Sequence, residues 1–184
     1  MAKKIAKLNV GGAVASSGGK CFKKLAVNKP TEGLEYTLSN DGTYYICTGM
    51  GTATDTDIII ADEIDGIKVK HIGANAFSGC TSLVSITFSK YSTLIGGSAF
   101  SGCTNLKSII IAHGIVAIPS NAFSGCTNLE SVAIPYSCKR ISDGAFSGCD
   151  KLKNVYYSSS AQNWYSIVIG DDNTALLTAT RHCV

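Results

Sequence analysis

The sequence predicts a mostly β solenoid, in which short coils of chain stack and each coil buries its apolar side against the next. The first observation is a pentapeptide, Ala-Phe-Ser-Gly-Cys, that occurs four times, beginning at Ala76, Ala99, Ala122 and Ala145. The second is the constant period of 23 residues between the copies. The third is a shared apolar pattern, Ile-x3-Ala-Phe-Ser-Gly-Cys-x2-Leu-x2-(Ile/Val)-x-(Phe/Ile/Tyr). A fixed period of this length is typical of stacked coils.

The end of each copy alternates apolar and polar residues, which predicts a short strand. In the first copy we expect Leu83, Ile86 and Phe88 to point inward. Strands of successive copies then form parallel ladders, with about 4.8 Å between neighbours. The same stacking predicts one buried aromatic column, made of Phe77, Phe100, Phe123 and Phe146.

The pentapeptide itself predicts a single helical turn. Asn75, Ser98 and Asn121 each precede an Ala-Phe pair, and short polar side chains are typical helix N-caps. The fourth copy has Gly144 at this position. The glycine inside the pentapeptide, such as Gly79, tolerates the positive φ that ends a turn. Each copy is therefore expected to run as helical turn, corner, strand and corner.

These repeats resemble the BspA-like, or Treponema pallidum type, leucine-rich-repeat family. Residues 34–38, 41–49 and 57–60 resemble the hairpin and first coil that precede the repeats in that family, and residues 155–180 resemble its C-terminal cap. The resemblance implies a leucine-rich-repeat solenoid with an N-terminal β-hairpin cap and a C-terminal cap. The expected units are an N-terminal arm (1–29), the N-terminal cap with the first coil (30–69), four repeats (70–161) and a C-terminal cap (162–184).

The charge is concentrated in the first unit, a glycine- and serine-rich arm. Residues 1–29 carry seven lysines and no acid, whereas residues 30–184 carry nine basic and thirteen acidic groups. A basic arm of this kind can attach the protein to a larger assembly, and its start resembles bacteriophage tail and fibre proteins. The candidate attachment residues are Lys3, Lys4, Lys7, Lys20, Lys23 and Lys24.

The arm is a poor signal peptide, because the stretch from Leu8 to Ala13 is too short and polar for an apolar h-region. No apolar run approaches the length of a membrane span, and we expect no nucleic-acid partner. Adhesin-like members of the family are typically secreted or surface-displayed, so the resemblance implies the extracellular surface, and the phage-like start implies a virion.

Eight cysteines raise the alternatives of zinc binding and disulfide bonding. One column has the 23-residue period, which is not a close-pair metal spacing, and parallel side chains do not turn toward one another as a disulfide requires. We therefore expect small buried free thiols on this column. Its members are Cys80, Cys103, Cys126 and Cys149.

No catalytic constellation is visible in the sequence. His71, His113 and His182 occupy different phases of the repeat, so none is expected beside a repeated nucleophile. Gly18-Gly19-Lys20 lacks the remaining residues of a phosphate-binding loop. The sequence therefore predicts no enzyme, no cofactor and no metal site.

The remaining candidate site is the outward face of the repeated strands, a shallow stripe with little charge. Such a ladder either offers an extended binding platform or only keeps the solenoid soluble. The candidate binding residues are Ser85, Thr87, Ser108, Ile110, Ser131, Ala133, Asn154 and Tyr156, and Ser89, Ala112, Pro135 and Ser158 are expected to point outward beside them. Tyr156 is the best single anchor, because aromatic residues concentrate binding energy.

Three functions follow from these observations. The first is a non-enzymatic, adhesin-like recognition module that binds a protein or a glycan through the ladder face. The second is a bacteriophage virion structural protein (tail, fibre or head decoration), attached by the arm with the solenoid displayed outward. The third is an enzyme, for which no residues are assigned.

Overall fold

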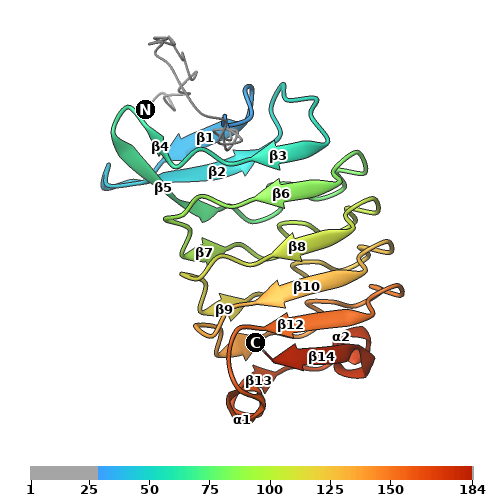
Figure 1. The fold of residues 1–184 in the computed structure, drawn as a ribbon. Helices are drawn as coiled ribbons and strands as arrows, with labels where there is room; N and C mark the ends of the chain where they lie inside the picture. The colour runs from blue at the N-terminus through green and yellow to red at the C-terminus, as the bar shows by residue number, and fades with distance from the viewer. Residues whose placement is uncertain (1–28, 184) are drawn as a thin grey trace, which may run out of the picture.

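The predicted mostly β solenoid is confirmed by the computed structural model, which describes residues 29–183 (Figure 1). Each coil contributes one longer and one shorter strand, and turns join them. Strands of successive coils lie side by side and form two ladders, named here the long ladder and the short ladder. Residues 1–28 of the predicted arm, with all six of its candidate lysines, lie outside the described residues.

The long ladder carries the candidate binding face. It consists of a four-stranded parallel sheet in the order β14-β12-β10-β8 and a two-stranded parallel sheet, β3-β6, nearer the N-terminal end. The 23-residue period keeps the register, since Ser131 lies opposite both Ser108 and Asn154. The strands are β3 (Asp57–Ile59), β6 (Ser85–Thr87), β8 (Ser108–Ile110), β10 (Ser131–Ile134), β12 (Asn154–Tyr157) and β14 (Thr180–Cys183).

The short ladder continues from the N-terminal cap. There β1 and β2 form an antiparallel hairpin, β2 pairs in parallel with β5, and β5 pairs with β7. Further along, β9, β11 and β13 form a three-stranded parallel sheet. The strands are β1 (Glu35–Leu38), β2 (Tyr45–Gly49), β4 (Glu63–Ile64), β5 (Ile67–Ile72), β7 (Leu94–Ile95), β9 (Ala117–Ile118), β11 (Arg140–Ile141) and β13 (Val168–Ile169).

Both ladders are interrupted between the same two coils. No strand pair joins β6 to β8 or β7 to β9 within residues 29–183. In the short ladder, the residue after a strand donates its backbone N–H to the preceding coil, as Gly96 does to Ile72 O and Ser142 does to Ile118 O. The equivalent residue after β9 is Pro119. Proline has no N–H to donate, so this ladder bond cannot form.

The core consists of the predicted aromatic column and the apolar strand residues around it. The column consists of four fully buried rings, those of Phe77, Phe100, Phe123 and Phe146. The centroids of neighbouring rings are 5.3–5.4 Å apart. Leu83 and Ile86 are also buried, as predicted, whereas Phe88 is half-buried and packs edge-on against Phe100.

The pentapeptide turns are chains of hydrogen bonds between residues three apart, such as Ser101 N–H to Ser98 O and Cys103 N–H to Phe100 O. The predicted N-cap role is wrong. Asn75, Ser98 and Asn121 have φ values of 57°, 55° and 57°, in the left-handed region, whereas an N-cap has extended backbone. Gly144 has φ 64° at the same position. The position therefore requires residues that tolerate left-handed backbone.

The C-terminal end holds the two helices of residues 29–183, α1 (Ala161–Trp164) and α2 (Thr174–Thr178). The buried Asn173 side chain takes the place of backbone hydrogen-bond groups that a further coil would supply. Its Oδ1 accepts the Phe146 N–H at 3.0 Å, where the Ala145 carbonyl accepts the equivalent Phe123 N–H one coil earlier. Its Nδ2 donates to the Ser142, Gly170 and Asp171 carbonyls at 2.9–3.1 Å. The last coil is thus closed by one side chain.

The cysteine column is made of free thiols, as predicted. Cys103, Cys126 and Cys149 are fully buried, and each Sγ–H donates to a phenylalanine carbonyl of the preceding coil at 3.1–3.2 Å. Cys80 is only half-buried, because it heads the column and has no equivalent turn before it. In the part of the chain that the structure describes, no helix is long and apolar enough to cross a membrane.

Candidate functional site

The long ladder places the predicted binding residues in two outward columns. One column contains Ser108, Ser131 and Asn154, which lie opposite one another on β8, β10 and β12. The other contains Ile110, Ala133 and Tyr156 in the same register. Ser85 and Thr87 lie on β6, which pairs with β3 and not with β8. The structure therefore brings six of the eight residues onto one sheet and places two on its neighbour.

Exposure along these columns is uneven. The Ile110 side chain is 73% exposed and Tyr156 is 40% exposed, so two large apolar groups face solvent. Ser131, Ala133 and Asn154 are half-buried. Two of the residues expected beside the face are wrongly assigned, because Ser89 and Pro135 are buried where each strand turns the corner into the coil. The usable face is thus shorter than the sequence predicts.

The interruption between β6 and β8 opens a groove on this face, with a volume of about 450 Å³. Thr87 and Phe88 lie along one side and Ser108 and Ile110 along the other. Phe88 occupies the place that Ile111 and Ile134 take in the next coils, and its ring remains half-buried. The groove is mainly apolar and lies where the ladder lacks strand-to-strand hydrogen bonds.

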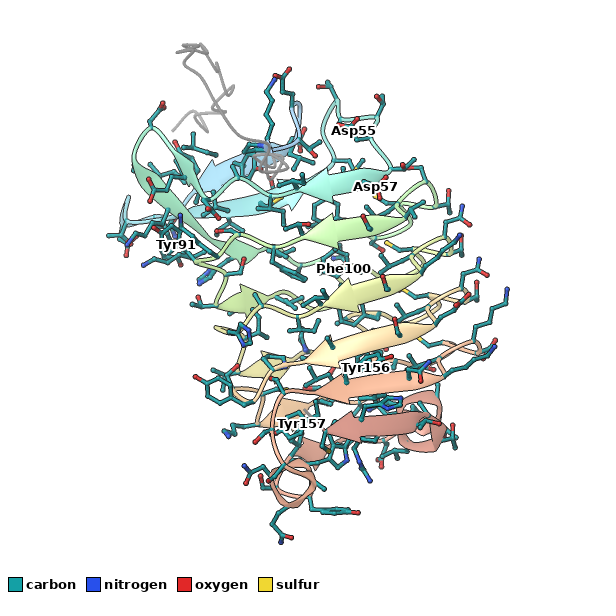
Figure 2. All side chains as sticks on the ribbon, viewed as in Figure 1. Asp55, Asp57, Tyr91, Phe100, Tyr156 and Tyr157 are labelled. Atoms are coloured by element: carbon teal, nitrogen blue, oxygen red, sulfur yellow. The ribbon has the colours of Figure 1, made fainter. Side chains whose placement is uncertain are left out.

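A second, smaller hollow of about 90 Å³ lies on the other side of Ile110. Ala133, Pro135 and Tyr156 line it together with Ile110. Ile110 is therefore a ridge between two hollows, and Figure 2 shows Tyr156 beyond it on the long ladder. The long ladder thus presents an exposed aliphatic side chain, two hollows and an aromatic ring on one face.

Sequence reasoning missed the contribution of β14 to the face. His182 lies opposite Tyr156, and the two rings stack with centroids 4.8 Å apart and planes 19° from parallel. His182 Nε2 is 2.9 Å from Asn154 Oδ1. The stack on His182, which itself contacts Asn154, restricts the orientation of the Tyr156 ring.

The face has no arrangement suited to catalysis or metal binding. Its outward residues are hydroxyl, amide, aliphatic and aromatic side chains together with the His182 imidazole, whose Nε2 lies against the Asn154 amide oxygen and not against a hydroxyl or thiol nucleophile. Within residues 29–183, no group of three or more His, Cys, Asp or Glu side chains is placed to hold a metal ion. Burial raises the pKa of the Cys103 and Cys149 thiols to about 12, which makes these groups inert as nucleophiles at neutral pH.

The geometry defines a leucine-rich-repeat solenoid whose outward ladder columns carry hydroxyl, amide, aliphatic and aromatic side chains. The comparison with protein families agrees: the model described as "BspA type Leucine rich repeat region (6 copies)" matches residues 57–172. This match covers more than half of the chain. The protein therefore belongs to the BspA-type leucine-rich-repeat family.

Solved structures show the same fold. A leucine rich cell surface protein from Faecalibacterium prausnitzii A2-165 is 31% identical with a TM-score of 0.59, and the match covers 73% of this chain and 40% of that one. A leucine-rich repeat protein from Bacteroides ovatus is 25% identical with a TM-score of 0.63, over 78% of this chain and 37% of that one. The Treponema pallidum leucine rich repeat protein is 23% identical with a TM-score of 0.59, and the match covers 78% of this chain and 82% of that one.

The chain thus spans about two fifths of the Faecalibacterium and Bacteroides proteins. A search of curated proteins finds no match. The resemblance of the arm to bacteriophage tail and fibre proteins has no counterpart among these relatives.

Proposed function

We propose that this protein is a non-enzymatic recognition domain of a bacterial cell surface, and that it binds a protein ligand through the long ladder. The observation that supports this proposal most directly is the exposure of Ile110, at 73%, between two hollows on a rigid sheet. An exposed apolar side chain that a partner can cover, next to an aromatic anchor such as Tyr156, fits the apolar core and the aromatic hot spots of protein interfaces.

The lack of charge on the outward columns favours a ligand that binds through apolar contacts and not through ion pairs, as many protein surfaces do. The two outward columns of β8, β10 and β12 contain no acidic or basic residue, and the charged lysine that lines the groove, Lys90, is paired with Asp62. His113 lines both hollows beside Ile110. Binding there depends mainly on apolar contact and on hydroxyl and amide hydrogen bonds, and it should respond weakly to salt. A glycan is the alternative ligand, since Tyr156 also offers a ring for stacking on a sugar.

The proposed surface location rests on the relative from Faecalibacterium prausnitzii, which is described as a leucine rich cell surface protein and is 31% identical. Antibody labelling of intact cells that express the protein from its own gene tests this location. Signal on intact cells that disappears after mild external protease treatment supports it, whereas signal only after lysis contradicts it.

A pair of matched variants tests the ladder face. Ile110 on β8 and Val168 on β13 are both strongly exposed aliphatic residues, at 73% and 61%, but Val168 lies on the short ladder. The purified chain is screened against an array of extracellular proteins and glycans, and each hit is measured again with Ile110→Asp, Tyr156→Ala and Val168→Asp.

We expect Ile110→Asp and Tyr156→Ala to lower the affinity for a genuine protein ligand by a factor of about 10 to 100, which corresponds to the loss of an interface hot spot. Val168→Asp should leave the affinity unchanged. A ligand that is lost with Val168→Asp and kept with Ile110→Asp would move the binding site to the short ladder.

A further inference from the structure

A third hollow lies at the corner between the N-terminal cap and the first repeat; none of the eight ladder-face residues lines it, although Lys90 also lines the groove beside Phe88. Its volume is about 490 Å³. The lining residues come from the turn before β2, from β5 and from the corners that follow β6 and β8: Tyr44, Lys68, Lys70, His71, Lys90, Tyr91, Ser92, Thr93 and Gly114. Figure 2 shows Tyr91 at the left edge of the molecule, at the opposite end of the coil from Asp57.

The hollow gathers positive charge in a domain that is otherwise acidic. Three of the nine basic residues of the segment 30–184 line it, and no acidic residue does. Lys90 is paired with Asp62, at 3.0 Å from Nζ to Oδ2. Glu63 lies opposite Lys68 across the β4–β5 hairpin. Among the described residues, however, Lys68 and Lys70 have no carboxylate within salt-bridge distance.

Aromatic rings lie close to these ammonium groups. Lys68 Nζ is 4.6 Å and Lys90 Nζ 4.9 Å from the centroid of the Tyr91 ring, and Lys70 Nζ is 5.5 Å from that of Tyr44. The Tyr44 and His71 rings are themselves 4.3 Å apart. Cation–π contacts at exposed sites stabilise by less than the rotamer entropy that a fixed lysine loses, so they favour these positions without fixing them. The positive charges are therefore biased toward the hollow before any ligand arrives.

The fold does not require this cluster. The positions of Lys90 and Tyr91 are occupied by His113 and Gly114 one coil later, and by Tyr136 and Ser137 in the coil after that. These later coils keep the same register although neither has the combination of a lysine followed by an aromatic ring. The cluster is thus specific to one corner of the molecule and has no structural counterpart in the repeats.

We propose that this hollow binds an acidic saccharide, with the carboxylate or sulfate of the sugar between Lys68 and Lys70 and its hydroxyls against Tyr44, His71 and Thr93. Two unpaired ammonium groups provide charge-assisted hydrogen bonds to one anion. The phenol, imidazole and hydroxyl groups around them supply donors and acceptors that match sugar hydroxyls. A volume of about 490 Å³ fits one or two sugar rings better than an extended peptide.

The pKa of His71 provides a reporter inside the hollow. Desolvation by burial, followed by the positive charge of Lys70, lowers this pKa below its ordinary value. A bound anion adds negative charge beside the ring and stabilises the protonated imidazole, so the pKa of His71 must rise on binding. A sugar that binds elsewhere leaves this pKa unchanged.

The experiment uses the full chain with sialyllactose, a hyaluronan tetrasaccharide and a sulfated heparin disaccharide, with lactose as the neutral control and an Asp/Glu hexapeptide as the acidic control. Affinity is measured by calorimetry, and the His71 resonance, assigned with His71→Gln, is titrated against pH by NMR. The basic arm could also attract anions, so Lys20→Gln/Lys23→Gln/Lys24→Gln is measured in parallel.

We expect at least one acidic sugar to bind, to raise the pKa of His71 and to lose about tenfold or more in affinity with Lys68→Gln/Lys70→Gln. The matched pair Lys139→Gln/Lys153→Gln, outside the hollow, should have no effect, and the melting temperatures should agree. The proposal is overturned if lactose or the acidic peptide binds equally well, if only the arm variant loses binding, or if no sugar shifts His71.

Discussion

The rings of Phe100 and Phe123 lie 5.3 Å apart between centroids, with planes only 3° from parallel. Phe77 and Phe146 extend the column at both ends, so the two middle rings stack on both sides. Parallel rings at this distance are offset, an arrangement that aromatic pairs favour. The contact between Phe77 and Phe100 also joins the two coils between which both ladders lack a strand pair. The aromatic column therefore joins these coils where the sheets do not, together with backbone hydrogen bonds between their turns such as Phe77 N–H to Ala99 O at 2.7 Å.

Replacing Phe123 by Ala should lower the free energy of unfolding by about 3–5 kcal/mol, because it leaves a cavity between two stacked rings in the fully buried column. Chemical denaturation with urea measures this loss. Phe77→Ala is the matched control at the end of the column, where one stacking contact is removed instead of two, and it should cost about 0.5–1.5 kcal/mol less. An unchanged melting temperature for Phe123→Ala would contradict the stacking.

The second prediction concerns the position with left-handed backbone before each Ala-Phe pair, which is occupied by Asn75, Ser98, Asn121 and Gly144. Gly144→Ala should cost about 1–2 kcal/mol, since φ is 64° and a Cβ would also lie 2.6 Å from Asn121 Oδ1. Ser98→Gly should be stabilising by a few tenths of a kcal/mol or more, because it removes a Cβ from backbone with φ 55°.

Gly97→Ala is the control for these two variants. Gly97 has ordinary backbone and its added Cβ meets only Ser120 O at 3.7 Å, so the substitution should be neutral or slightly stabilising. Thermal denaturation ranks the three variants. If Gly144→Ala and Gly97→Ala behave alike, the left-handed backbone is not what determines the residue type at position 144.

Much of this fold follows from the sequence because the period is constant. A spacing of 23 residues fixes the register of β8, β10 and β12, and with it the burial of the phenylalanines and of most column cysteines. The caps at Asn75 and its equivalents were misassigned because Asn and Ser favour both N-caps and left-handed backbone. Gly144 was the discriminating signal, since glycine tolerates positive φ but supplies no capping side chain.

Other features depend on long-range packing. The pairing of Asn154 with Thr180 has a spacing of 26 residues, because α1 and α2 lengthen the last coil. The sequence of β14, Thr-Arg-His-Cys, also lacks the apolar alternation that marked the earlier strands. The stack of His182 on Tyr156 was therefore not predictable from periodicity. The groove beside Ile110 was missed as well, since it arises from an interruption between coils of identical length.

Asn173 gives a third prediction, about how the solenoid ends. Asn173→Ala should destabilise the protein by about 1–3 kcal/mol, because it leaves the buried Phe146 N–H without an acceptor. The amide of Phe146 should then exchange with deuterium faster than in the unmodified chain. Asn163→Ala is the control, since Asn163 is exposed in α1 and should change stability by about 0.5 kcal/mol or less. Unchanged exchange at Phe146 would mean that another group closes the last coil.

The buried thiols give a prediction about reactivity. In the folded protein, iodoacetamide should label Cys183, which is exposed, well before Cys103, Cys126 and Cys149, which are fully buried. Denaturation without reductant should make all of the column cysteines available, because they are free thiols. Peptide mapping by mass spectrometry measures the labelling. Any of the column cysteines found paired after denaturation would contradict this assignment.

The same thiols predict how stability depends on pH. Desolvation raises the pKa of Cys103 and Cys149 from an ordinary value near 9 to about 12. Between these limits the unfolded chain loses thiol protons that the native protein keeps, so the free energy of unfolding should fall as pH rises from 9 to 12. Urea denaturation across this range measures the slope. Burial also raises the pKa of the Cys47 and Cys126 thiols, so Cys103→Ser/Cys149→Ser should make the slope shallower without abolishing it. An equally steep slope in that variant would assign the loss to other residues.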